Sequence, residues 1–369
     1  MAASLAARRT ADRVNYLNVG LMVVSCLAAY VFPFELFLFS YAVLGPLHYL
    51  TEISWLHDRK YFAATTSPQQ TWQPQRYWVA VAVLTAGVML YGVIAERVLK
   101  QTVSPVWEIG LFYFVFITAG LLIFARRKMT GAVLVAFAAL SAFFFSGSRD
   151  FALVAFFLVT IVHVLVFTAA FILYGALKSK SRSGMLSLVV FGACTVSFFV
   201  FVPAALGATV GGYVRHSYAS FQTLNAELIR IFSLGTGTSL SEIYDSTAGL
   251  IIMRFVAFAY TYHYLNWFSK TSIIKWHRIT QARTAIIAVL WMSSLAVYAY
   301  SYDLGMIALY FLSVLHVMLE FPLNHQTFAG IGKELYALAG AFGSRLRPAA
   351  AGSARGLPSG LGKSRRSRR

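Results

Sequence analysis

Residues 34–57, FELFLFSYAVLGPLHYLTEISWLH, join an apolar run of membrane-spanning length to a histidine–glutamate motif. The segment from His48 to His57 reads H-x3-E-x4-H, and the segment from His316 to His325, HVMLEFPLNH, repeats the pattern. Residues four apart share one face of a helix. We therefore expect His48 with Glu52, and His316 with Glu320, to present an imidazole beside a carboxylate. This repeated motif is the candidate site.

The composition places the chain in a membrane. It is 59% hydrophobic and only 12% charged, with a mean hydropathy of +0.67, whereas a soluble domain has roughly 25% charged residues. Apolar runs of spanning length predict an all-α polytopic integral membrane protein with about ten transmembrane helices. The expected spans are 17–33, 34–51, 77–95, 105–125, 129–147, 151–175, 184–207, 246–268, 283–301 and 304–322.

The distribution of basic residues predicts the orientation. Lys and Arg concentrate in cytoplasmic segments of membrane proteins, and most of the 31 in this chain fall on one side if both termini are cytoplasmic. The predicted organisation is a basic cytoplasmic N-terminus (1–16), one transmembrane domain (17–330) and a basic, mostly disordered cytoplasmic tail (331–369). The expected location is the cell (inner) membrane, with multiple passes.

Two segments outside the spans have their own predictions. The extracytoplasmic segment 208–245 has helical apolar spacing from Tyr218 to Phe232, which favours an interfacial helix, a lid over the outer face, or a loop with one or two helical turns. The basic tail is expected to contact anionic lipid head groups. Nucleic-acid binding, which a formal net charge of +18 would suggest in a soluble protein, is the weaker interpretation.

Ionisable residues inside the spans define the site hypothesis. Such residues are costly in lipid and usually face the bundle interior or a water-filled cavity. Those that form the candidate site are His48, His163, His263, His316, Glu52 and Glu320. Imidazoles with carboxylates suit iron, zinc or copper better than calcium or magnesium. The glutamates can bind the metal, orient a histidine or act catalytically, and His57 and His325 are possible accessory residues.

The predicted topology permits the four intramembrane histidines to converge on one site. Their spans all run in one direction, so the imidazoles can line one cavity open to the cytoplasmic side. Tyr260, Tyr264 and Trp267, around His263, are candidates for the wall of an apolar substrate channel; the alternative for them is the aromatic belt at the membrane interface. For each histidine, the alternative is a neutral ring bonded to a neighbouring helix. Pro46 and Pro322 are expected to perturb their helices.

The segment from Gly45 to Glu52, GPLHYLTE, resembles the first motif of the membrane beta-carotene dioxygenases of bacteria and archaea (Brp/Blh type), which has a proline–histidine pair and an acid four residues later. The resemblance implies a non-haem iron, held by His48, His163 and His263, and cleavage of a carotenoid double bond by O₂. This chain departs from the family at Tyr49, where the family has glycine, and at Glu52, where it has aspartate. It also has Trp267 instead of the second histidine of a late pair, which leaves His316 as the candidate replacement.

Three functions follow from these observations. The first is a membrane metal-dependent oxygenase, with iron or another transition metal such as zinc, acting on a lipid or isoprenoid substrate. The second is a proton-linked transporter or channel with His and Glu gates, since histidine titrates near physiological pH. The third is a non-catalytic membrane scaffold or assembly protein. The expected partners are membrane lipids and an apolar small molecule.

Overall fold

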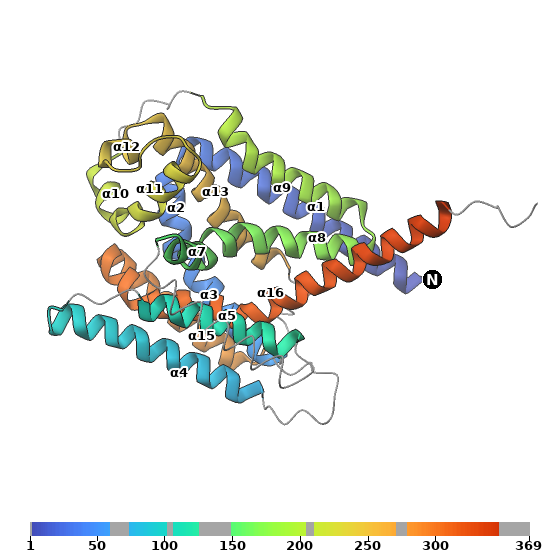
Figure 1. The fold of residues 1–369 in the computed structure, drawn as a ribbon, viewed down its shortest axis with the longest axis horizontal. Coiled ribbons are helices and arrows are strands. Elements are labelled where there is room, and N and C mark those ends of the chain that lie inside the picture. Colours follow the sequence, from blue (N-terminus) through green and yellow to red (C-terminus); the bar gives the residue numbers. More distant parts are fainter. Residues whose placement is uncertain are drawn as a thin grey trace, which may run out of the picture.

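The computed structural model describes residues 2–59, 74–101, 106–124, 149–203, 210–270 and 279–346. These residues are almost entirely helical, and none of them forms a strand. The elements are α1 (Ala2–Val31), α2 (Pro33–Phe39), η1 (Ser40–Leu44), α3 (Gly45–Arg59), α4 (Pro74–Val93), η2 (Ile94–Val98), α5 (Val106–Phe124), α7 (Arg149–Val159), η3 (Val162–Phe167), α8 (Thr168–Ser179), α9 (Arg182–Val200), α10 (Gly212–Ser217), η4 (Ala219–Phe221), α11 (Gln222–Ile231), α12 (Leu240–Tyr244), α13 (Thr247–Ser269), α15 (Gln281–Tyr300) and α16 (Tyr302–Leu346) (Figure 1).

Seven stretches of the described chain are long and apolar enough to cross a membrane. They are Arg9–Val31, Pro33–Asp58, Val79–Glu96, Val162–Ser179, Arg182–Val200, Gln281–Tyr300 and Tyr302–Gly340. Each overlaps one of the ten predicted spans, so the all-helical membrane architecture is confirmed and the number ten stays a prediction. The predicted span 129–147 lies outside the described residues. The predicted span 105–125 is the helix α5, whose apolar part, Trp107–Leu121, is shorter than the seven.

The predicted span 246–268 is the helix α13, and it runs through the interior of the bundle. Most of its side chains are buried, including Arg254 and His263. It packs against α1, α2 and α9. A helix covered by other helices needs no lipid-facing surface, so α13 can keep the polar side chains of Arg254 and His263 inside the bundle.

The two ends of the bundle are formed by different parts of the chain, and the predicted orientation of the termini stays a prediction. The N-terminus and the last turns of α16 lie at one end of the molecule in Figure 1, and α10, α11 and α12 lie at the other. The helical spacing predicted from Tyr218 to Phe232 is confirmed by η4 and α11, and their place at a membrane interface stays a prediction. The helix α16 continues beyond residue 330 to Leu346, and the remainder of the predicted tail, 347–369, lies outside the described residues.

Two short π-helices set the positions of His48 and His163: η1 directly precedes α3, and η3 contains His163. The π-helix η1 ends next to Gly45, whose N–H donates to Ser40 O, so the wider turn precedes Pro46 in the first turn of α3, where a proline is tolerated. The predicted span 151–175 is interrupted after α7 and continues through the π-helix η3, which carries His163. A π turn rotates the side chains that follow it and often marks a functional site. Pro322 lies inside α16 without ending that helix.

Candidate metal centre

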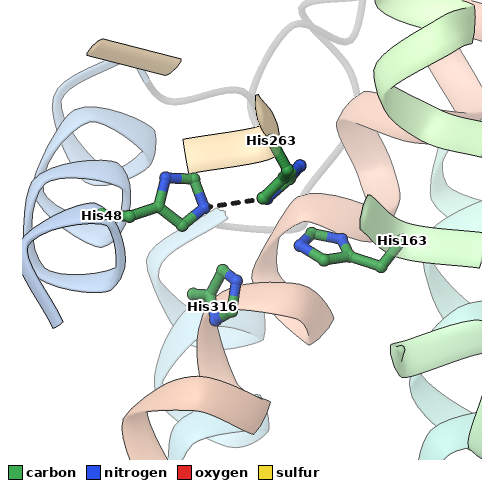
Figure 2. Close-up of side chains that lie close together, drawn as sticks. All are labelled: His48, His163, His263 and His316. Atoms are coloured by element: carbon green, nitrogen blue, oxygen red, sulfur yellow. Dashed lines mark hydrogen bonds between the residues drawn. The ribbon is translucent and has the colours of Figure 1, made fainter. Parts of the chain in front are cut away.

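Four histidines from four separate elements meet in the interior of the bundle. His48 comes from α3, His163 from η3, His263 from α13 and His316 from α16. Figure 2 shows the four rings turned toward one another. Each residue exposes 7% of its surface or less. We call these residues the four-histidine cluster; it lies where the apolar core around α1, α2 and α13 meets the one around α4, α5 and α16.

The ring nitrogens are close enough to share one ion. One nitrogen from each histidine lies within 4.8 Å of those of the other three, so the cluster could hold a metal ion. The Nε2 atoms of His48 and His263 are 3.1 Å apart. Metal–nitrogen bonds of about 2.0–2.1 Å keep two ligand atoms of one ion within about 4.2 Å. The cluster would therefore contract by a few tenths of an ångström around a bound ion.

Neighbouring groups orient two of the rings. Thr168 Oγ1 is 2.9 Å from His263 Nδ1, and the Leu312 carbonyl oxygen is 3.3 Å from His316 Nδ1. A hydrogen bond to one ring nitrogen sets the tautomer and directs the other nitrogen to a metal. Because these contacts occupy Nδ1, the Nε2 atoms of His263 and His316 are the nitrogens that can face a metal ion at the centre of the cluster.

Two buried glutamates contact the outer members of the cluster. Glu52 Oε2 lies 3.0 Å from His48 Nε2, one helical turn away, as expected. Glu320 Oε2 lies 3.0 Å from His163 Nδ1, on another element. The expectation that Glu320 pairs with His316, its neighbour in the motif, is therefore wrong: the ring of His316 instead stacks on Tyr49, with centroids 4.4 Å apart.

The unsatisfied nitrogens distinguish a metal site from a packed group of neutral rings. His48 and His263 can satisfy each other through their Nε2 atoms. Four ring nitrogens of the cluster are buried and have no hydrogen-bond partner among the described residues: His48 Nδ1, His163 Nδ1, His163 Nε2 and His316 Nε2. Leaving such atoms unsatisfied costs about 1–3 kcal/mol each. Four imidazole donors with two nearby carboxylates fit a transition metal such as iron or zinc.

The predicted accessory histidines lie away from the cluster. His57 is largely exposed, and its Nδ1 is 3.6 Å from Asp58 Oδ1. His325 Nδ1 donates to the Phe321 carbonyl oxygen at 2.7 Å, and its ring packs on Phe116. The last histidine of each motif copy therefore does not join the four-histidine cluster.

A cavity of about 540 Å³, here called the inner cavity, reaches the cluster at His163 and His316. Tyr260 and Tyr264 line it, and their role in a substrate channel stays a prediction. Trp267 does not: it donates to Thr51 Oγ1 at 3.0 Å and packs beside His48, so it covers the cluster from another side.

The direction of the inner cavity differs from the prediction of a cavity open to the cytoplasm. Its far end is formed by η4 and α11, through Ser220, Phe221 and Thr223. This is the end of the bundle opposite the N-terminus (Figure 1). Within the predicted topology, the inner cavity extends toward the extracytoplasmic side because α11 folds back over the bundle.

Sequence reasoning missed Thr168, Glu108 and the role of Tyr49. Thr168 follows His163 by five residues, which is the π-helix spacing, but a regular helix would not place it near the cluster. Glu108 lies close to the start of α5, where the first-turn acid looks like an ordinary helix terminus. Its position on the inner cavity requires the packing of α5 against α16.

A scan of protein-family models, a search of curated proteins and a search of solved structures each found no match to this chain. The candidate site therefore stands on its own geometry. The resemblance of the segment Gly45–Glu52 to the carotene dioxygenases stays a prediction.

Proposed function

We propose that the protein is a membrane metalloenzyme, an iron-dependent oxygenase that acts on a lipid or isoprenoid substrate. The observation that carries the proposal is the four-histidine cluster, with the unsatisfied Nε2 atoms of His163 and His316 at the end of the inner cavity. We place the protein in the cell (inner) membrane, where an apolar substrate would dissolve in the same lipid bilayer that surrounds the membrane-length helices.

The four histidines would hold the metal, and a redox-active metal such as iron would supply the capacity to react with O₂ that the side chains lack. Thr168 and Glu320 would keep His263 and His163 in the ligating tautomer. Glu52, next to His48, is positioned to accept or return a proton at Oε2.

The inner cavity would receive the substrate. Its volume is within the usual range for small-molecule sites, about 300–1,000 Å³. Phe112, Phe156 and Phe221 contribute apolar wall surface. The walls would exclude bulk water from the reacting bond, and the substrate would enter the site only as far as the rings of His163 and His316.

Metal analysis of the detergent-purified protein tests the proposal. We expect about one iron per chain in the wild type after anaerobic loading, and its loss in the His48→Ala/His316→Ala variant. The matched control is His57→Ala/His325→Ala, which removes one histidine from each copy of the same motif outside the cluster and should keep the metal. Turnover of carotenoids and other isoprenoids with O₂ would then be compared. A folded wild type without metal, or equal metal in both variants, would contradict the proposal.

A further inference from the structure

A second cavity of about 700 Å³, here called the lateral pocket, lies between α4, α5 and the start of α16. Several of its lining side chains point outward: Leu90 and Trp107 are each 61% exposed and Tyr91 is 52% exposed. α4 and α16 contain membrane-length apolar stretches. Leu90 and Tyr91 lie on α4, and exposed apolar side chains on such a helix face lipid, so the lateral pocket opens toward the membrane interior.

The lateral pocket and the inner cavity share a wall. Glu108, Ser220, Met306 and Tyr310 line both. The inner cavity continues from this wall to His163 and His316. Together the two spaces form a path from the lipid-facing surface to the four-histidine cluster.

The charge of this path is opposite to that of the chain. The protein carries 31 Lys and Arg against 13 Asp and Glu, yet the described residues that line the two spaces include Glu96, Glu108 and Glu227 and no Lys or Arg. Glu227 forms an ion pair with Arg230. Glu108, on the shared wall, has no hydrogen-bond or ion-pair partner among the described residues.

We infer that the site takes a long-chain amphiphile whose terminal group donates a hydrogen bond and carries no negative charge, such as an alcohol or an amine. The terminal group binds Glu108 at the shared wall, and the apolar chain extends through the inner cavity toward His163 and His316. This inference rests on the proposed function only for the reaction; the selectivity for the terminal group comes from Glu108 alone. A carboxylate or phosphate at this position would meet a carboxylate without a cation to balance it.

Quenching of tryptophan fluorescence measures the selectivity, because Trp107 lines the lateral pocket. The probes are a dibrominated long-chain alcohol, the carboxylic acid of the same chain and the methyl ether of the alcohol, each added at neutral pH to the full-length protein in nanodiscs. The Trp107→Phe variant identifies the part of the signal that comes from the pocket. We expect the alcohol to bind about ten-fold more tightly than the acid or the ether, the size of effect expected of a hydrogen bond to a charged group.

The Glu108→Gln variant should reduce the preference for the alcohol over the acid to less than about three-fold, since a neutral amide no longer repels the acid. The matched control is Glu35→Gln, an exposed glutamate that lines neither space, and it should keep the wild-type preference. Equal binding of the three probes, tighter binding of the acid, or an unchanged preference in Glu108→Gln would overturn the inference.

Metal content of the same samples separates this inference from the proposed function. If a protein that holds no metal binds the alcohol selectively, the amphiphile site is supported and the proposed oxygenase function is contradicted. If the metal-loaded protein binds the alcohol, the acid and the ether equally, the amphiphile site is contradicted and the proposed oxygenase function is unaffected.

Discussion

The Nε2 atoms of His48 and His263 lie 3.1 Å apart, although the two residues belong to helices far apart in the chain. His163 and His316 complete the cluster from two further elements. Such convergence of four buried imidazoles in an apolar bundle has a cost in desolvation and packing. A bound metal would offset that cost by coordinating the ring nitrogens, which can be tested residue by residue.

Glu320→Gln should weaken metal binding about 10–100-fold, which is the usual effect of losing a group that orients a ligand. The substitution replaces the carboxylate, 3.0 Å from His163 Nδ1, with a neutral amide. Metal affinity is measured by competition with a chelator. Glu334→Gln, farther along the same helix, is the control and should bind metal as the wild type does; equal affinities in both variants would show that Glu320 does not act through His163.

Thr168→Val should also weaken metal binding, by about ten-fold or more. The substitution keeps the shape of the side chain and removes the hydroxyl that contacts His263 Nδ1. Thr118→Val is the matched control, since the Thr118 hydroxyl donates only to the carbonyl oxygen of Phe114 in its own helix. Unchanged affinity in Thr168→Val, measured by the same competition, would remove Thr168 from the site.

Metal binding should stabilise the folded protein. A ligand at 100 times its dissociation constant contributes about 2.7 kcal/mol if it binds only the folded state. We expect the unfolding temperature in detergent to rise with added iron or zinc, and to fall back to its metal-free value when a chelator removes the ion. The His48→Ala/His316→Ala variant should show no rise; a rise of equal size there would indicate binding elsewhere.

Gly249→Ala should destabilise the protein by about 1–3 kcal/mol. A Cβ at Gly249 would collide with the backbone carbonyl oxygens of Ile243 and Glu242, where Ser246 caps the start of α13. Gly192→Ala, in the middle of α9, has open space around its Cβ and should be neutral or stabilising by up to about 1 kcal/mol. Thermal unfolding of both variants in one detergent distinguishes the two outcomes.

The segment 236–238 should loosen in acid. Desolvation raises the pKa of Glu242, but hydrogen bonds from Thr236 and Thr238 lower it, and the net pKa lies below its ordinary value. A lowered folded-state pKa contributes stability above the ordinary pKa that is lost as the pH falls through the folded-state value. Hydrogen exchange of amides 236–238, corrected for its intrinsic pH dependence, should therefore accelerate toward low pH in the wild type. In Glu242→Gln it should be fast at every pH.

Some properties of this protein are encoded locally and can be read without the fold. The apolar runs at 17–33, 184–207 and 283–301 predict helices that the structure contains, because burial of the backbone in lipid leaves a helix as the only local solution. The cost of an ionisable residue in such a run likewise identified His48, His163, His263 and His316 as candidates. The pairing of His48 with Glu52 follows from one helical turn.

Other properties depend on contacts between distant segments. Glu320 contacts His163 rather than His316 because α16 packs against α8 and α7, the helices on either side of η3, and the π turn at η3 determines where His163 points. The inner cavity extends toward α11 because that helix folds back over the bundle. Residue types and helical spacing by themselves determined the membrane class and the candidate ligands. Helix packing, which depends on the register of four helices at once, decided which histidines meet, which carboxylates lie beside them and toward which end of the bundle the inner cavity extends.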